Sequence, residues 1–529
     1  MSFDTFTAAL NVDSFPFVTD LLPRPVLLTG LDVPPRVPRT DLGTFESKNP
    51  ELAQHIYAQN VMPSSEGLMS VGYQQIIPAI VGQTHFDEAI VLRDVDENVF
   101  LFSPGHGNNF IYRADVGTWV SNNPIASLDE NILVTRAFVN GRTFVCYGNT
   151  GVFEYDTATN SFNEVTVVGM NKADIDGISA SNNYLLAWNN IEIRWSSLVD
   201  PLDLTPSIFT GAGFATPQDV RGPIRNIVPI SGGFIAYTTR NAVAALYTNN
   251  ARAPFAFKEI SNTGGIIHPE EISLEATLGF HYAFSSAGLQ KITASNSEVV
   301  SVAATDFIAG RMIETFDTVT NTLTVEKLST DLALKIAYVS NRYLVISYGK
   351  ATSPHKEFTH AIVLDTQLKR WGKLKVDHTD CFTYPYPSLI GQLSEVRAKQ
   401  SMAFLQKDGT VLLCILDYRE MQDQGVLMLG RFQRTRGQAI TLQTIEFENL
   451  TTAYPPSVYL LLSDDGKNYV SVQPLQLLSN GNTYKKYGAP SYSGSGAAPR
   501  RTAKSFSALI TGTFELSTAM FTVTRHGNR

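Results

Sequence analysis

Short apolar segments separated by glycine, asparagine and aspartate recur through residues 85–420, and they are typical of β-strands joined by tight turns. Successive segments are centred 40 to 68 residues apart, at Phe100, Phe144, Tyr184, Ile235, Tyr282, Tyr343 and Val411. A repeat of about 40–50 residues that holds four strands is typical of a β-propeller blade. The pattern therefore predicts an all-β fold in which residues 85–429 form a β-propeller of about seven blades, with loop insertions in the longer late repeats.

A second repeat supports the propeller. Three hairpins consist of a strand, a turn led by aspartate, and an aromatic residue that opens the return strand; the pairs are Asp115 with Trp119, Asp156 with Phe162, and Asp365 with Trp371. An aspartate side chain accepts hydrogen bonds from turn amides, and the aromatic ring covers the face between neighbouring sheets. The same hairpin occurs in β-sandwiches and β-helices, so those folds stay open as alternatives.

The N-terminal part, residues 1–84, differs from the repeats. Six prolines remove backbone donors and disfavour helix, which predicts an extended arm over residues 11–50; they are Pro16, Pro23, Pro25, Pro34, Pro35 and Pro38. Asn49, Pro50 and Glu51 then provide an N-cap, a first-turn proline and a first-turn acid. They predict one short helix that ends near Gln59.

The C-terminal part, residues 430–529, shows apolar and polar alternation that predicts a small antiparallel β-sandwich. It holds 11 Lys and Arg against 5 Asp and Glu, a net charge of +6, which leaves −14 for residues 1–429 of a chain whose total is −8. A basic docking surface is predicted at Arg431, Arg434, Arg436, Arg500, Arg501 and Lys504. A nucleic-acid surface, a solvated strand and a subunit contact are all compatible with this charge.

Composition places the chain among globular proteins, with 43% hydrophobic and 17% charged residues. Its three cysteines, Cys146, Cys381 and Cys414, form no CxxC pair and are predicted to be buried thiols. Residues 1–10 contain no Lys or Arg, and no window approaches the roughly 18 apolar residues of a membrane span. We therefore expect no secretory signal and no membrane anchor.

The residues give no catalytic, cofactor or metal signature. No histidine pair has zinc-hydrolase spacing, and there is no G-x-S-x-G elbow or P-loop. His378, Asp380 and Cys381 lie together, but alternate side-chain directions on an extended segment prevent convergence on one ion, so a surface loop is expected. A pair of distant glycosidase carboxylates stays open. The prediction is a protein that is not an enzyme and has no cofactor.

Two segments resemble a known family. The first covers residues 60–73 and includes Asn60, Pro63, Gly67, Gly72 and Tyr73; the second covers residues 193–206 and includes Arg194, Trp195, Asp200 and Pro201, with Leu204 where an aromatic is common. They resemble virion proteins of tailed bacteriophages. The best fit is to tail hub or nozzle proteins of short-tailed phages, including the packaged-DNA stabilisation type.

The resemblance implies a structural virion protein that is made in the host cytoplasm. It implies a homohexamer around the tail axis, below the portal and its adaptor, that retains packaged DNA and conducts it at ejection. Tail fibres or a tail needle are further implied partners. Double-stranded DNA would pass without sequence-specific binding, because an acidic surface repels it. The basic module could dock on the adaptor or a neighbouring subunit, and the arm could strap onto the next subunit.

Two other functions stay open. A glycan-binding or glycan-cleaving propeller, like a tail spike or depolymerase, predicts a cleft with exposed aromatics and a carboxylate pair. A tail-fibre adaptor predicts three-fold symmetry.

Overall fold

The computed structural model describes 26 stretches of the chain. They are residues 3–9, 26–27, 55–65, 67–80, 86–93, 99–104, 109–113, 118–121, 133–250, 252–274, 279–302, 304–305, 308, 312–317, 322–327, 334–349, 356–383, 402–415, 425–429, 432–433, 440–447, 455–463, 471–478, 481, 483–486 and 505–525. Within these residues, no helix is both long enough and apolar enough to cross a membrane.

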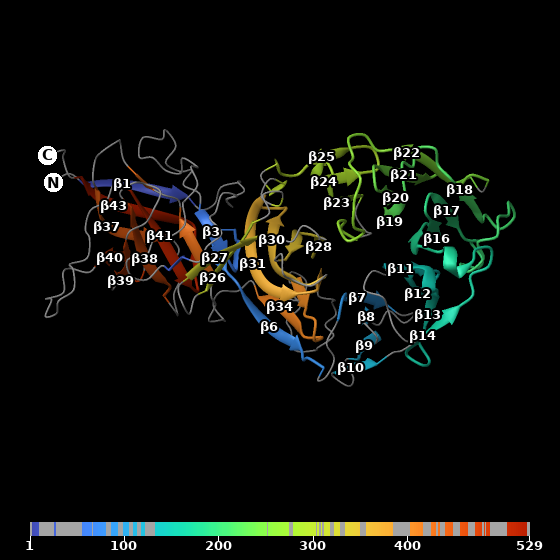
Figure 1. Ribbon diagram of the computed structural model, residues 1–529, viewed down its shortest axis with the longest axis horizontal. Helices are drawn as coiled ribbons and strands as arrows, with labels where there is room; N and C mark the ends of the chain where they lie inside the picture. Colours follow the sequence, from blue (N-terminus) through green and yellow to red (C-terminus); the bar gives the residue numbers. More distant parts are fainter. Residues whose placement is uncertain are drawn as a thin grey trace.

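Seven antiparallel sheets stand around a common centre and form a β-propeller, which confirms the predicted all-β fold class (Figure 1). Blades 1 to 4 each take four strands from one continuous stretch of chain. The strands are β7 (Ile90–Arg93), β8 (Val99–Pro104), β9 (Asn109–Arg113) and β10 (Thr118–Ser121) in blade 1; β11 (Val134–Val139), β12 (Arg142–Tyr147), β13 (Val152–Asp156) and β14 (Ser161–Val165) in blade 2; β15 (Gly177–Ser181), β16 (Tyr184–Asn189), β17 (Glu192–Trp195) and β18 (Gly213–Ala215) in blade 3; and β19 (Ile224–Ile230), β20 (Gly233–Thr238), β21 (Ala242–Tyr247) and β22 (Phe255–Glu259) in blade 4.

The remaining blades complete the ring. Among the described residues, blade 5 has three strands, blade 6 has four that belong to a larger sheet, and blade 7 has three that are completed by a strand from the N-terminal part. They are β23 (Phe280–Ser285), β24 (Gly288–Thr293) and β25 (Ser297–Val299); β28 (Lys335–Val339), β29 (Tyr343–Tyr348), β30 (Phe358–Asp365) and β31 (Arg370–His378); and β32 (Asp380–Thr383), β33 (Met402–Leu405) and β34 (Val411–Ile415).

The central strands of the blades are apolar without alternation because blades pack face to face. Every residue of β20 is buried, and so is every residue of β29. A strand covered on both faces needs apolar side chains in both directions. Tight turns join these strands; Asn140 and Gly141, for example, have φ values of 52° and 77°, as a type I′ hairpin requires.

The propeller is closed and extended by residues from the N-terminal part. Strand β6 (Gly72–Ile77) pairs with β34 and supplies the fourth strand of blade 7. Strands β4 (Val61–Pro63) and β5 (Leu68–Ser70) extend blade 6 beyond β31, and β42 (Glu515–Leu516) follows β5 in the same sheet. One continuous seven-stranded sheet therefore connects the propeller to the C-terminal part.

The C-terminal part is a second β-structure at the other end of the molecule (Figure 1). Its strands follow the order β1-β43-β37-β40-β39-β38-β41-β35-β3, and β36 pairs with β41. Side chains of both halves of this order, such as Phe521 and Ile510, share one core, as in the predicted sandwich. The strands are β1 (Phe3–Ala9), β3 (His55–Gln59), β35 (Gly425–Leu429), β36 (Phe432–Gln433), β37 (Ile440–Phe447), β38 (Ser457–Ser463), β39 (Ser471–Leu477), β40 (Thr483–Lys486), β41 (Ser505–Gly512) and β43 (Thr518–Arg525).

A hairpin and two 3-10 helices of the described residues lie outside these sheets. The hairpin of β26 (Met312–Asp317) and β27 (Thr322–Lys327), paired with β2 (Val26–Leu27), follows blade 5 and precedes blade 6 in the sequence. The lengthened repeat expected to hold a loop insertion thus holds a hairpin. Two 3-10 helices occur at Gly148–Thr150 and Lys172–Asp174.

The predicted helix from Asn49 to Gln59 is wrong where the structure describes it. Residues His55–Gln59 form β3, which pairs with β35 from Gln59↔Val426 to His55↔Leu429. Local N-cap signals favour a helix, but pairing with a strand some 370 residues away satisfies the same backbone groups. Tertiary pairing overrides a weak local preference.

The structure also places two boundaries differently from the sequence. Blade 7 includes β6, which precedes residue 85, and β35, which precedes residue 430, belongs to the C-terminal sheet. The predicted arm, residues 11–50, lies outside the described residues except for β2.

Candidate functional site at the propeller centre

The first strands of neighbouring blades lie side by side at the centre of the propeller (Figure 1). A cavity of about 510 Å³ lies between blades 1 to 4, and the walls are mostly apolar. Polar lining is supplied by Glu88, Thr135, Arg136, Thr143, Ser179 and Asn226. Charged groups of several blades therefore meet near the centre.

A buried ion pair joins three blades at this centre. Lys335 begins β28 of blade 6, and its Nζ lies 2.9 Å from Oδ1 of Asp380, which begins β32 of blade 7. Oδ2 of Asp380 accepts the backbone N–H of Ala89, beside β7 of blade 1, at 2.8 Å. The side chains of Lys335 and Asp380 are only 10% and 5% exposed. We call Lys335, Asp380, Glu88 and Glu270 the central cluster.

The electrostatics of the central cluster keep Lys335 charged. Burial alone would lower the pKa of Lys335, but the carboxylates of Asp380, Glu88 and Glu270 outweigh burial and raise it above its ordinary value. Burial raises the pKa of Glu88, against the opposing effect of Lys335. Glu270 also faces Lys356, whose Nζ lies 3.5 Å from its Oε1.

This arrangement suits a structural role for Lys335 rather than proton transfer. A lysine acts as a base or nucleophile when its pKa is lowered, whereas here it is raised. A buried pair that loses one partner leaves an uncompensated charge, which is strongly destabilising. The central cluster therefore holds blades 6, 7 and 1 in one arrangement.

Two buried histidines make internal hydrogen bonds in the propeller. His281 of blade 5 lies 3.0 Å from the Tyr237 hydroxyl of blade 4 through Nδ1, and 2.9 Å from the Pro229 carbonyl through Nε2. His378 similarly contacts the Val376 carbonyl and the Ser347 hydroxyl. Burial lowers the pKa of each histidine to about 4. Both therefore stay neutral at pH 7. His281 links blade 5 to blade 4, whereas the hydrogen bonds of His378 lie within blade 6.

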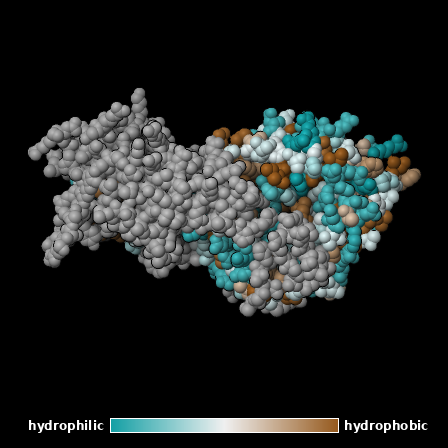
Figure 2. Space-filling model, viewed as in Figure 1, coloured by the Kyte–Doolittle hydropathy of each residue, from teal (hydrophilic) through white to brown (hydrophobic). Residues whose placement is uncertain are grey.

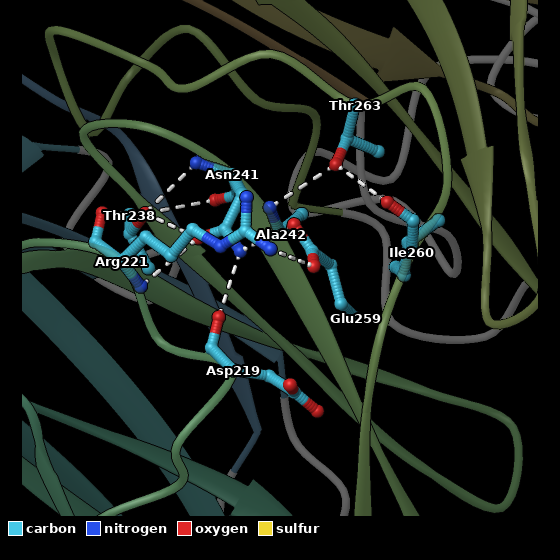
Figure 3. Close-up of polar contacts among 8 residues, drawn as sticks. All are labelled: Asp219, Arg221, Thr238, Asn241, Ala242, Glu259, Ile260 and Thr263. Carbon is cyan, nitrogen blue, oxygen red and sulfur yellow. Dashed lines mark hydrogen bonds and ion pairs between the residues drawn. The ribbon is translucent and has the colours of Figure 1, made fainter.

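A polar network at the rim of blade 4 fixes the connection from blade 3 (Figure 3). Asn241, which is 3% exposed, donates through Nδ2 to the Asp219 carbonyl at 2.8 Å and to Glu259 Oε1 at 3.0 Å. Arg221 pairs with the other oxygen of Glu259 at 2.7 Å. Because Asp219 and Arg221 precede β19, the network holds the segment that leaves blade 3.

The predicted hairpin aspartates have different surroundings. Asp156 is at a solvent-exposed turn, where it accepts the Ala158 N–H at 2.9 Å, and this hydrogen bond lowers its pKa. Asp365 is fully buried, accepts the N–H groups of Gln367 and Leu368 at 3.0 Å, and pairs with Arg342 at 2.6 Å. Asp115 lies outside the described residues.

The predicted hairpin aromatics lie between sheets. Phe162 of blade 2 packs on Phe102 of blade 1, with ring centroids 4.5 Å apart. Trp119 of blade 1 donates from Nε1 to the Gly409 carbonyl of blade 7 at 2.8 Å. Trp371 is buried in the core that blade 6 shares with the C-terminal sheet.

The first family-like segment, residues 60–73, lies at the joint between propeller and C-terminal part. Oδ1 of Asn60 accepts the backbone N–H of Lys375 at 2.8 Å and the Tyr73 hydroxyl at 3.2 Å. A Cβ on Gly67 would lie 2.0 Å from the Leu516 carbonyl oxygen, so only glycine fits between β5 and β42. Pro63 belongs to β4, and Gly72 begins β6.

The second family-like segment forms a loop on blade 3. Arg194 pairs with Glu192 at 2.5 Å and donates to the Gly169 carbonyl. Trp195 Nε1 donates to the Gly211 carbonyl at 3.0 Å, and Asp200 Oδ1 accepts the Leu202 N–H at 3.0 Å. Pro201 is buried at the base of this loop.

The predicted basic docking surface cannot be placed. All six residues, Arg431, Arg434, Arg436, Arg500, Arg501 and Lys504, lie outside the part of the chain that the structure describes.

The structure brings together residues that the sequence analysis did not. Lys335, Glu88 and Glu270 were not singled out, and residues 378–381 were expected in a surface loop. That expectation is wrong, because His378 ends β31, Asp380 begins β32, and both are buried. The available signal was position: Lys335 and Asp380 begin the first strand of a blade, and Glu88 comes just before one. The three cysteines are buried, as predicted.

Among the described residues, no group of three or more His, Cys, Asp or Glu side chains is placed to hold a metal ion. No protein-family model and no curated protein matches the chain. Solved structures that resemble it include the WD40 β-propeller domain of Doa1, with 8% identity and a TM-score of 0.39 over 65% of this chain and 98% of that one. YCF48 bound to a D1 peptide gives 10% identity and a TM-score of 0.38 over 68% and 98%. The sheet order above, rather than these likenesses, carries the assignment of the fold.

Proposed function

We infer that this chain is a structural protein of a phage virion, a subunit of a ring-shaped tail hub or nozzle below the portal and adaptor. In this role it retains packaged DNA and conducts it at ejection. The observation that carries the proposal is the position of residues 60–73. This segment, which resembles tail hub proteins, closes the propeller through β6 and connects it to the C-terminal part through β4 and β5.

The joint supports a role that involves force. Domains linked only by a flexible segment move relative to each other by default. Here β31, β4, β5 and β42 are neighbours in one sheet, and Arg370 at the start of β31 donates to the Gly67 carbonyl at 3.2 Å. A load on one body therefore passes to the other through paired strands. A subunit that holds back packaged DNA needs this stiffness.

The net charge supports a path along which DNA is not bound tightly. Each phosphate that a protein neutralises releases counterions and adds affinity, which would slow a sliding duplex. Residues 1–429 carry a net charge of −14. The propeller centre, a cavity of about 510 Å³ beside the central cluster, is far smaller than a duplex. The proposed DNA path is therefore the axis of the ring, between subunits.

The oligomeric state of the full-length protein tests this proposal. We expect light scattering to give six times the chain mass of 58.1 kDa at high concentration. Deletion of residues 11–50 should reduce assembly if the arm straps onto a neighbour. A trimer would favour the tail-fibre adaptor, and a monomer that cleaves or retains host polysaccharide would favour the glycan-acting propeller. Either result would contradict the proposed hub.

A further inference from the structure

The cavity at the propeller centre has the size and the lining of a small-molecule site. Its volume of about 510 Å³ falls within the range of roughly 300–1,000 Å³ that such sites occupy. Its mostly apolar walls include Ile90, Val134, Phe138, Ile178 and Val228. Figure 2 shows hydrophobic side chains scattered among hydrophilic ones over the coloured face of the propeller. Scattered exposed apolar residues are ordinary, whereas apolar side chains gathered in one cavity favour ligand binding.

Strand β11 of blade 2 exposes two large side chains at this cavity. Arg136 and Phe138 both line it and are exposed, whereas Thr135 and Ala137 of the same strand are buried. Because alternate side chains of a strand share one face, Arg136 and Phe138 lie on the same side of β11. The Phe138 side chain is 56% exposed. This side of β11 therefore offers one ligand both an apolar contact and a positive charge.

The Arg136 guanidinium is not used by the fold. Among the residues that the structure describes, it has no hydrogen-bond or ion-pair partner. Its charge acts on the pKa of Glu88, but less than Lys335 or Asp380 does. An arginine side chain matches a carboxylate in shape and can bind it through two parallel hydrogen bonds. The Arg136 charge is therefore available to the anionic group of a ligand.

Ser179 of β15 provides a second polar group without a partner. It lines the cavity and is 3% exposed, and its hydroxyl makes no hydrogen bond to any described residue. The neighbouring Thr135 hydroxyl, by contrast, is already engaged, because it accepts the Ile178 N–H at 2.8 Å. A buried polar group that lacks a hydrogen bond is costly. A ligand that accepts a hydrogen bond from Ser179 would remove this cost.

Glu88 is the acidic side chain in the lining, and it belongs to the central cluster. Burial outweighs the charge of Lys335 and raises the pKa of the Glu88 carboxyl. A raised pKa disfavours the anionic form that a cationic ligand would need. A ligand that carries a carboxylate therefore suits this cavity better than one that carries an ammonium group.

We propose that the cavity between blades 1 to 4 binds a small amphipathic carboxylate, such as a medium-chain fatty acid. The Arg136 guanidinium pairs with the carboxylate, and the hydrocarbon chain packs on Phe138 and the apolar walls. The Ser179 hydroxyl offers a further hydrogen bond. The cavity lies within one subunit, away from the ring axis that the proposed function assigns to DNA. The inference therefore goes beyond that function and does not depend on it.

Calorimetric titration of the full-length protein tests the class of ligand. The probes are octanoate, octanol and octylamine, which share a chain length and differ in the charge of the head group. We expect one octanoate to bind per chain, about tenfold or more tightly than either other probe, because a guanidinium–carboxylate pair is charge-assisted. No binding of octanoate at millimolar concentration, or octylamine that binds as tightly, would overturn the inference.

Matched arginine variants test the assignment of the charge. Arg136→Met should weaken octanoate binding by about tenfold or more and leave octanol binding unchanged, because only the carboxylate uses the guanidinium. Arg225→Met is the control, since Arg225 of β19 is also exposed on the first strand of a blade but does not line the cavity. Equal octanoate binding by the two variants would contradict the pairing with Arg136.

A photoreactive octanoate locates the site without any substitution. The probe carries a diazirine at its chain end, and labelled peptides are identified by mass spectrometry after irradiation. We expect label on peptides that contain β11, β15 or β19. Label confined to other parts of the chain would overturn the inference. None of these measurements reports on ring assembly, so their failure would leave the proposed hub in place.

Discussion

Blades 2 to 4 and the joint region are built in opposite ways. In blades 2 to 4, each strand pairs with its neighbour in sequence, as Val134 does with Tyr147. In the joint, Gly72 pairs with Ile415 and Val61 pairs with Lys373, so strands meet across more than 300 residues. Contacts between distant segments carry a larger loop-closure cost and form later in folding. Pairing between strands that are neighbours in sequence therefore forms the blades. Pairing between strands that are remote in sequence forms the joint to the C-terminal part.

The largest expected effect comes from breaking the central cluster. Lys335→Met leaves Asp380 buried without its cation and should lower the free energy of unfolding by about 3–5 kcal/mol. Lys172→Met is the matched control within the local blades, because Lys172 and Glu164 pair at 2.8 Å but are 66% and 50% exposed. That variant should lose at most about 1 kcal/mol. Chemical denaturation measures both, and equal losses would contradict a special role for the centre.

The next largest difference in stability is expected between variants of the two hairpin aspartates, Asp365 and Asp156. Asp365→Ala removes a buried partner of Arg342 and two turn hydrogen bonds, so we expect a loss of about 3 kcal/mol. Asp156→Ala alters the equivalent turn in blade 2, where the carboxylate is in solvent and water replaces its hydrogen bonds. Melting temperatures should therefore fall clearly for Asp365→Ala and hardly at all for Asp156→Ala. The reverse order would mean that turn geometry, rather than burial, decides.

Acid should weaken the propeller through His281 in blade 5 and His378 in blade 6. Burial lowers their folded pKa to about 4, below the unfolded value of about 6.5, so the unfolded chain binds more protons between these values. Their contribution to stability is complete above about pH 6.5 and is lost as the pH falls toward 4, by about 2 kcal/mol per histidine at pH 5. Unfolding measured at pH 7 and pH 5 tests this.

Substitution of each histidine tests whether His281 and His378 cause the loss of stability in acid. His281→Gln and His378→Gln should each make stability less dependent on pH over this range, whatever their effect at pH 7. An unchanged pH dependence in both variants would contradict the assignment.

The smallest effect is expected at the joint itself. Gly67→Ala places a Cβ 2.0 Å from the Leu516 carbonyl oxygen and should cost about 1–2 kcal/mol as β5 and β42 separate. Gly279→Ala is the control in blade 5, because nothing lies within 4 Å of the added methyl group. Hydrogen exchange should rise at residues 514–517 in the first variant only. Unchanged exchange there would show that the contact between β5 and β42 does not hold the joint.

The local part of this fold was predictable from sequence because each blade repeats the same short pattern. The runs at Phe144, Tyr184 and Ile235 mark the buried central strands of blades 2 to 4, and periodicity alone found them. Strand β3 was missed because its partner is remote and because residues 49–51, just before it, carry helix-start signals. The central cluster was missed for the same reason, since no local pattern shows that Lys335 will meet Asp380 and Glu88.

In the candidate site too, local features were predictable from sequence and features that depend on remote contacts were not. Asp156 and Phe162 could be placed on a hairpin from their spacing, whereas the burial of Asp365 depends on Arg342 and on the surrounding blade 6 sheet. Phe209 lies just beyond the second family-like segment, residues 193–206, and was not predicted to be exposed, because its exposure is a property of three-dimensional packing.

The most direct test of the proposed hub is electron microscopy of native particles labelled with an antibody to this chain, followed by symmetry averaging of the labelled structure. A tail hub predicts label in a six-fold collar on the tail axis. Label on peripheral three-fold spikes, or no label on any particle, would contradict it.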